Sequence, residues 1–141
     1  LRSVSPSENG AYPIVYVATS TMTFYSDGDD DGVIEQIRYF LSGSTLKKGV
    51  IKPTGSPYVY NSVNETISSL AYNIKNSSTT SLFEYYDTNY TGTSSPLSYP
   101  VNITSIRLIR INLNIDADPN RSPLPRLYTS TVNLRNFKDN L

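Results

Sequence analysis

Residues 103–115 alternate between two kinds of side chain for most of their length, and this alternation limits the fold more than any other feature of the chain. In an extended segment one face is mainly apolar and the other mainly polar. A repeat of two residues is the repeat of a β-strand with one buried face. We therefore expect a core strand with Ile103, Ser105, Arg107, Ile109, Ile111, Leu113 and Ile115 on one face, and Leu108, Arg110, Asn112 and Asn114 on the other.

Several other segments also have strand character. Residues 14–27 are rich in β-branched and aromatic side chains, which predicts one long or two short strands. The turn at 42–44 has the sequence Ser-Gly-Ser, so a strand before it and a strand after it are expected to pair as a hairpin. The full set of further strands is 33–42, with Val33, Ile37, Tyr39 and Leu41 on one face and Gln36 and Arg38 on the other, then 45–53, 82–87 and 126–136.

One segment has helical spacing instead. Ile67, Leu70, Ala71 and Ile74 recur at intervals of three and four residues, and Asn64 precedes them as a candidate cap. We expect a short helix over 64–76, although its β-branched and aromatic residues also suit a strand. The fold class is thus mainly β: an antiparallel sheet of hairpins with at most one short helix.

Length and composition limit the number of domains and the kinds of functional site that the chain can have. The chain has 141 residues and predicts a single domain, 1–141, with an irregular segment at 1–13. Twelve basic residues balance twelve acidic ones, so the net charge gives no argument for a nucleic-acid partner. Cysteine and histidine are absent, which removes disulfides, thiolate metal sites and the commonest general base. This composition favours an extracytoplasmic domain at the cell surface or in the periplasm.

The beginning of the chain suggests processing. It opens at Leu1 without a start methionine, and no apolar run approaches the roughly 18 residues that span a bilayer. We expect a processed or truncated product whose targeting segment has been removed.

Five carboxylates crowd into a turn between two predicted strands: Asp27, Asp29, Asp30, Asp31 and Glu35. Neighbouring carboxylates repel by about 1 kcal/mol per pair even in water. Such a turn is costly unless a cation neutralises it.

The spacing of these residues predicts calcium. Asp27, Asp29 and Asp31 followed by Gly32 form a DxDxDG pattern, in which alternate side chains converge on one point. The twelfth position of a helix-loop-helix calcium site would need a Glu and holds Arg38 instead, which excludes that type of site. The flanking segments are the predicted strands. The expected ligands are Asp27, Asp29, Asp31, the Val33 carbonyl and Glu35, with Asp30 pointing outward.

Weaker candidates remain open. The alternative to calcium, which the spacing favours less, is a solvated Asp/Gly turn of the kind that hairpins often have. Asp116, Asp118 and Asn120 repeat the spacing of a metal loop, but Arg121 stands where the glycine should be. Glu35 and Glu84 are a conceivable acid pair, although no motif of an enzyme supports them. The tyrosines at 58, 60, 85, 86 and 90 could form an adhesive surface, but more often such residues pack on a sheet.

With these residues in view, the chain resembles the head domain of type IV pilin-like proteins, in particular minor pilins and the J-type minor pseudopilins of type II secretion. The likeness begins near residue 14 and follows the order of four segments: TFYSDGDDDGVIEQIRYFLSGSTLKKGVIKP, LFEYYD, IRLIRINLNIDADP and STVNLRNFKDNL.

The resemblance implies a non-enzymatic subunit that helps initiate or cap a pilus or pseudopilus by contacting other pilins or pseudopilins. It also implies a long apolar N-terminal helix, absent from this chain, as the only membrane contact. One sheet face should then be exposed or covered by residues 1–13. The alternative function is a calcium-stabilised adhesin or glycan-binding module that uses the tyrosines and the polar loops 77–81 and 88–96.

Overall fold

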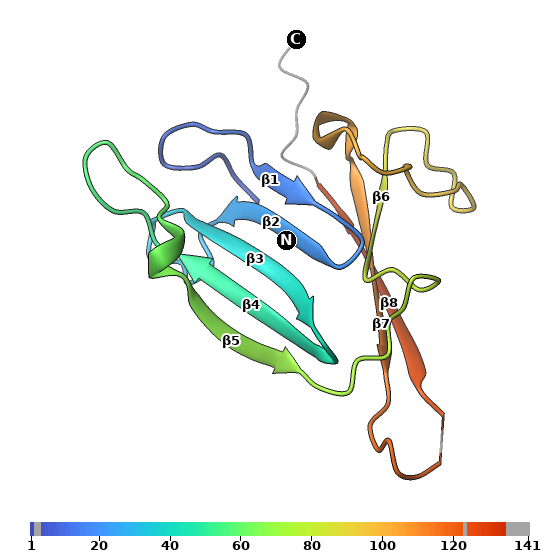
Figure 1. Cartoon of the computed structure of the whole chain (residues 1–141). Coiled ribbons are helices and arrows are strands. Elements are labelled where there is room, and N and C mark those ends of the chain that lie inside the picture. The colour runs from blue at the N-terminus through green and yellow to red at the C-terminus, as the bar shows by residue number, and fades with distance from the viewer. Residues whose placement is uncertain (2–3, 123, 135–141) are drawn as a thin grey trace.

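The computed structural model describes residue 1 and residues 4–122 and 124–134, and these form two antiparallel sheets (Figure 1). The larger sheet has five strands in chain order, each pairing with the next. Antiparallel neighbours can be joined by a tight turn, as β3 and β4 are at Gly43 and Ser44. The strands are β1 (Ile14–Val17), β2 (Thr21–Ser26), β3 (Glu35–Ser42), β4 (Thr45–Ile51) and β5 (Thr66–Ala71).

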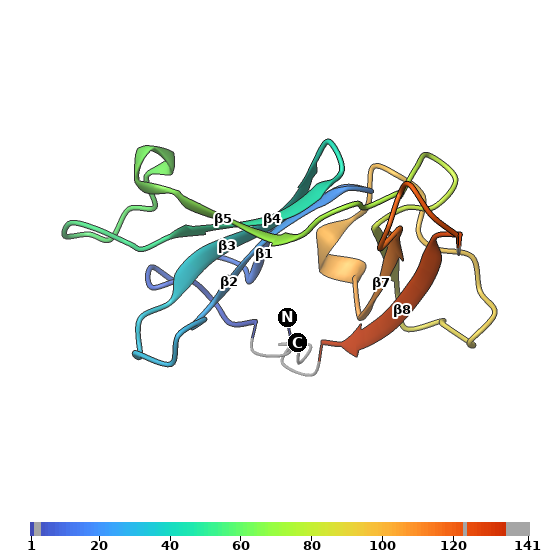
Figure 2. The same cartoon turned by 90° about the horizontal axis from the view of Figure 1, so that it is seen from below.

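The smaller sheet comes from the second half of the chain. Its strands β6 (Phe83–Tyr86), β7 (Leu108–Ile115) and β8 (Arg126–Asn133) also lie in chain order and pair antiparallel. Figure 2 shows this sheet at an angle to the larger one. The predicted class, mainly β and built of hairpins, is confirmed.

A single core cluster joins the two sheets. Met22, Phe24 and Ile37 contribute from the larger sheet, and Tyr85 and Ile109 from the smaller one, all of them buried. The alternation predicted for β7 places Ile109 in this core. Burial of these apolar side chains is the main force that holds the sheets together.

The helix predicted over 64–76 is wrong. A short 3-10 turn, η1 (Ser62–Asn64), is followed directly by β5, and Asn61 rather than Asn64 caps that turn. Ile67 and Leu70, which suggested a helical face, remain 50% and 49% exposed. As a strand, this segment gains backbone hydrogen bonds along the edge of β4.

The first part of the predicted strand 103–115 is also different. Residues Ile103–Ser105 form a 3-10 turn, η2, and the strand begins only at Leu108. The Asn102 side chain accepts a hydrogen bond from the Thr104 amide at 3.2 Å, which favours the turn. On the opposite face the buried Asn112 is satisfied, because its Nδ2 donates to the Ser81 carbonyl and its Oδ1 accepts the Thr129 hydroxyl.

The remaining strands lie within or close to the ranges predicted from the sequence. Residues 14–27 contain two short strands, and the turn at Gly43 and Ser44 joins β3 to β4. In the irregular segment 1–13, Val4 bridges to Ser26 and is buried, so residues 4 and 5 lie beside β2 and extend the larger sheet. The end of the last predicted strand, 135–136, lies outside the described residues.

The described residues contain no helix of sufficient length and apolar character to cross a bilayer.

Candidate metal site in the β2–β3 loop

The acidic residues occupy the connection between β2 and β3, where Ser26 pairs with Glu35 at the base of the loop. Asp27 organises this loop: Oδ1 accepts the Asp31 amide at 3.1 Å and Oδ2 accepts the Gly32 amide at 2.9 Å. Gly32 has φ +85°, a conformation that side chains disfavour, so glycine permits the bend here. The loop is therefore folded by its own aspartate and glycine.

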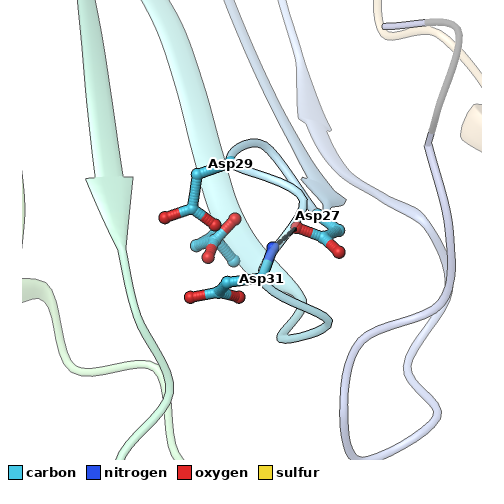
Figure 3. Close-up of side chains that lie close together, drawn as sticks. Asp27, Asp29 and Asp31 are labelled. Carbon is cyan, nitrogen blue, oxygen red and sulfur yellow. Dashed lines mark hydrogen bonds between the residues drawn. The ribbon is translucent and has the colours of Figure 1, made fainter.

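The fold brings four carboxylates together. Asp27, Asp29, Asp31 and Glu35 each offer an oxygen atom, and these atoms lie within 4.8 Å of one another. Figure 3 shows Asp29 and Asp31 projecting to the same side of the loop, with Asp27 turned toward the Asp31 backbone. Among the residues that the structure describes, this is the one cluster of at least three acidic groups so arranged. Such a cluster can hold a metal ion.

Glu35 differs from the three aspartates because it is buried. It lies at the start of β3 and is only 1% exposed. Its Oε2 accepts the Gly28 amide at 2.8 Å, but Oε1 is buried and accepts no hydrogen bond. A buried acceptor without a partner costs about 1–3 kcal/mol. This orphan oxygen therefore needs a partner that a cation can supply.

Lys52 provides a cation at the edge of the cluster. Its Nζ donates to Asp31 Oδ2 at 2.7 Å and to Asp29 Oδ2 at 2.9 Å. The Glu35 Oε1 atom lies 3.6 Å from the same nitrogen, beyond hydrogen-bond distance. The lysine hydrogen bond and the Val33 amide hold the pKa of the Asp31 carboxyl below 3.8, and both aspartates raise the pKa of Lys52.

Sequence reasoning missed Lys52, although the sequence contained the signal. The turn at Gly43 and Ser44 pairs Ser42 with Thr45, and the same register pairs Gln36 with Ile51. One step further along the hairpin, position 52 stands opposite position 35. A basic residue opposite a buried acid is a cross-strand charge pair.

The other predicted ligands behave differently. Val33 donates its amide to Asp31 Oδ1 at 2.9 Å, whereas none of the described contacts fixes its carbonyl, the expected ligand. Asp30 is exposed, has φ +57° and is not part of the cluster. The Val33 ligand stays a prediction.

The second acidic turn forms its own local structure. Asp118 accepts the Asn120 amide at 3.1 Å, and its carboxylate lies 3.9 Å from Arg121. Asp116 begins the same loop just after β7. No third carboxylate joins Asp116 and Asp118 in the described structure. This turn is a loop closed by its own side chains.

The tyrosines do not gather into one exposed surface. Tyr85 and Tyr86 are buried, while Tyr58 is 46% exposed. The Tyr90 hydroxyl accepts a hydrogen bond from Arg110 Nη2 at 2.7 Å. The prediction of an adhesive surface is therefore wrong for Tyr85 and Tyr86, whose side chains are buried.

The conceivable acid pair is likewise separated. Glu84 belongs to β6 in the smaller sheet, where it accepts the Tyr86 hydroxyl at 3.0 Å and lies 3.4 Å from Arg110. Glu35 belongs to the larger sheet and faces Lys52. Each acid thus has its own set of partners on its own sheet.

Tyr60, which the sequence suggested only for an adhesive surface, ties the acidic loop to two other segments. The Tyr60 hydroxyl donates to the Ile34 carbonyl at 2.8 Å and accepts the Glu8 amide at 3.0 Å. Glu8 Oε1 in turn accepts the Ile34 amide at 2.7 Å. The loop end at Ile34 is therefore fixed to both the N-terminal segment and the connection before η1.

Comparison of the chain with protein-family models, with curated proteins and with solved structures finds no significant match in any of the three.

Proposed function

We propose that this chain is the globular head of a pilin-like subunit, a non-enzymatic component that helps initiate or cap a type IV pilus or a type II secretion pseudopilus. The sequence supports this proposal through the order of segments that resembles pilin heads. The structure supports it through an apolar hollow between the two sheets.

That hollow is the observation that carries the proposal. Its volume is about 330 Å³, and Leu1 lies among the residues that line it. Leu70 from β5 is 49% exposed there, so apolar surface remains open to solvent. The pilin resemblance requires a sheet face that receives an apolar helix, and burying apolar area yields about 25 cal/mol per Å². The lining also includes Tyr39, Leu46, Leu82, Phe83, Ile111, Leu113 and Val132.

In this proposal the acidic loop binds a structural calcium ion. Calcium takes six to eight oxygen ligands at about 2.3–2.6 Å in flexible geometry. Four clustered carboxylates, one of them the buried Glu35, suit that preference. The ion would neutralise the loop and lock the β2–β3 hairpin, which couples the stability of the head to extracellular calcium.

The assembly role is tested by blocking the hollow. Leu70→Asp places a charge at its edge, while Val63→Asp adds the same charge on η1, where Val63 is 86% exposed. Co-purification with the pilins or pseudopilins of the host's own system is then compared. We expect Leu70→Asp to weaken binding at least about tenfold and Val63→Asp to leave it unchanged.

The contrary outcome is equally clear. If the unsubstituted head stays monomeric and binds none of the sibling subunits, the assembly role is wrong. Retention on a glycan array would in that case favour the adhesin.

The calcium role is tested by thermal unfolding in excess chelator, in millimolar calcium and in millimolar magnesium. A ligand at 100 times its Kd stabilises by about 2.7 kcal/mol, which is roughly 8 °C for a domain of this size. We expect such a rise with calcium and a smaller one with magnesium. The absence of any shift would make the acidic loop a plain charged turn.

A further inference from the structure

We propose that Lys52 is a built-in competitor for the divalent cation, so that a metal ion enters the β2–β3 loop by displacing the Lys52 ammonium group. This inference rests on the proposed metal site and identifies the residue that sets its affinity and its selectivity for divalent ions.

The first support is the place that the ammonium group occupies. Its nitrogen lies 2.7 Å from Asp31 Oδ2, 2.9 Å from Asp29 Oδ2 and 3.6 Å from Glu35 Oε1. These three carboxylates, with Asp27, are the same groups that cluster within 4.8 Å. An ion that binds all four needs the space that Lys52 now fills.

The second support is that Lys52 satisfies the cluster incompletely. The buried Glu35 Oε1 has no hydrogen-bond partner, although Lys52 is its nearest cation. A calcium ion bonds oxygen at about 2.3–2.6 Å and would give this atom a direct ligand contact. Lys52 is therefore a partial substitute for an ion and not its equal.

Charge explains the selectivity. Four carboxylates carry a formal charge of minus four, which one lysine reduces to minus three and a calcium ion to minus two. A monovalent ion that replaced Lys52 would leave the charge unchanged and would gain nothing from the exchange. A divalent ion therefore improves the neutralisation of the loop, whereas a monovalent ion does not.

The ammonium group and the ion can also exchange from the solvent side of the loop. The Lys52 side chain is 54% exposed, and the Asp29 and Asp31 side chains are 52% and 41% exposed. The ammonium group can therefore move into water without breaking the core, and the ion can enter from the same side. Exposed ion pairs of this kind are individually weak.

The decisive experiment is calorimetric titration of chelator-treated protein with calcium chloride. Lys52→Met removes the competitor, Lys52→Arg keeps its charge, and Lys48→Met removes the same charge from β4. We expect Lys52→Met to bind calcium about tenfold more tightly, with Lys52→Arg closer to the unsubstituted protein and Lys48→Met unchanged.

A second measurement needs no substitution and covers the case in which Lys52→Met does not fold without metal. The unsubstituted head is acylated with a lysine reagent, with and without calcium chloride, and the modified sites are mapped by mass spectrometry. Displacement should raise the reactivity of Lys52 relative to Lys48. Equal or lower reactivity of Lys52 in saturating calcium would overturn the inference.

The outcomes separate this inference from the metal site itself. If the unsubstituted head and Lys52→Met bind calcium equally, Lys52 is no competitor although the site is real. If only Lys52→Met binds calcium, the competitor is real and the calcium role of the natural chain is wrong. Binding by neither protein overturns both.

Discussion

Glu35 and Gly28 are joined by a hydrogen bond of 2.8 Å, which fastens the first turn of the acidic loop to the start of β3. The contact is close on both sides, because a Cβ added at Gly28 would lie 3.0 Å from Ile37 Cδ1 and 3.5 Å from Glu35 Oε2. One carboxylate oxygen of Glu35 thus supports the fold. The other, Oε1, stays open for a cation.

Glu35→Gln separates these two roles. The amide oxygen can still accept the Gly28 hydrogen bond, and the new NH₂ group can donate to the cluster but cannot bind a metal ion. We expect calcium affinity to fall at least about tenfold, while the unfolding temperature in chelator changes by only a few degrees. Titration calorimetry and thermal unfolding measure the two effects, and undiminished affinity would rule Glu35 out as a ligand.

The neighbouring aspartates should divide into ligands and bystanders. Asp29→Asn and Asp31→Asn each remove a clustered carboxylate, and the calcium-induced rise in unfolding temperature should largely disappear. Asp30→Asn removes the same charge outside the cluster, and asparagine tolerates the left-handed φ of +57°. This control should keep most of the rise. Equal losses in all three variants would reduce the effect to general charge.

Acid should weaken the metal-free loop. Because Lys52 and the Val33 amide lower the Asp31 pKa below 3.8, ionised Asp31 stabilises the fold above that value, and this contribution is lost as pH falls through the folded pKa. The raised pKa of Lys52 stabilises up to 10.5 and is lost only at higher pH. We expect a flat stability profile in chelator between about pH 5 and 9 from this pair, with a decline below about pH 4 that Lys52→Met reduces.

An ion pair between Arg38 and Glu65 lies just before the edge strand β5. Arg38 donates from Nε and Nη2 to Glu65, both at 2.9 Å, and a Cβ at Gly49 would overlap the Glu65 carboxylate. Gly49→Ala should therefore displace the flexible Glu65 side chain, break its partly exposed ion pair with Arg38 and destabilise the domain by about 1 kcal/mol. In a Glu65→Ala background the same change should cost clearly less. Chemical denaturation of the double-mutant cycle measures this, and additive losses would contradict the clash.

Tyr60 should couple distant segments to the acidic loop. Tyr60→Phe removes the hydrogen bonds to the Ile34 carbonyl and the Glu8 amide and should cost about 1–2 kcal/mol of unfolding free energy. Hydrogen exchange should also accelerate at the Ile34 amide. Tyr58→Phe is the control, because Tyr58 is 46% exposed and only its carbonyl has a described hydrogen bond, to Asn9. Equal effects of both substitutions would contradict the coupling.

Local sequence determined most of the β architecture. Period-two alternation located β3 and β7, and the turn at Gly43 and Ser44 predicted β4 as the returning strand of a hairpin. The aspartate spacing and Gly32 placed the acidic loop between two strands, because these residues fold the turn through their own short-range hydrogen bonds. Interactions between residues that lie close together along the chain can be predicted from the sequence.

Tertiary structure decided what depends on distant partners. Residues 66–71 became a strand because the edge of β4 was free to pair, which outweighed their helical spacing. The separation into two sheets and the closing of loop 27–34 by Tyr60 also depend on contacts across the chain. Above all, the meeting of Lys52 with Asp29 and Asp31 follows from the folded hairpin. The hairpin register places position 52 opposite position 35, but the contacts of Lys52 with Asp29 and Asp31 form only when the folded strands bring these side chains together.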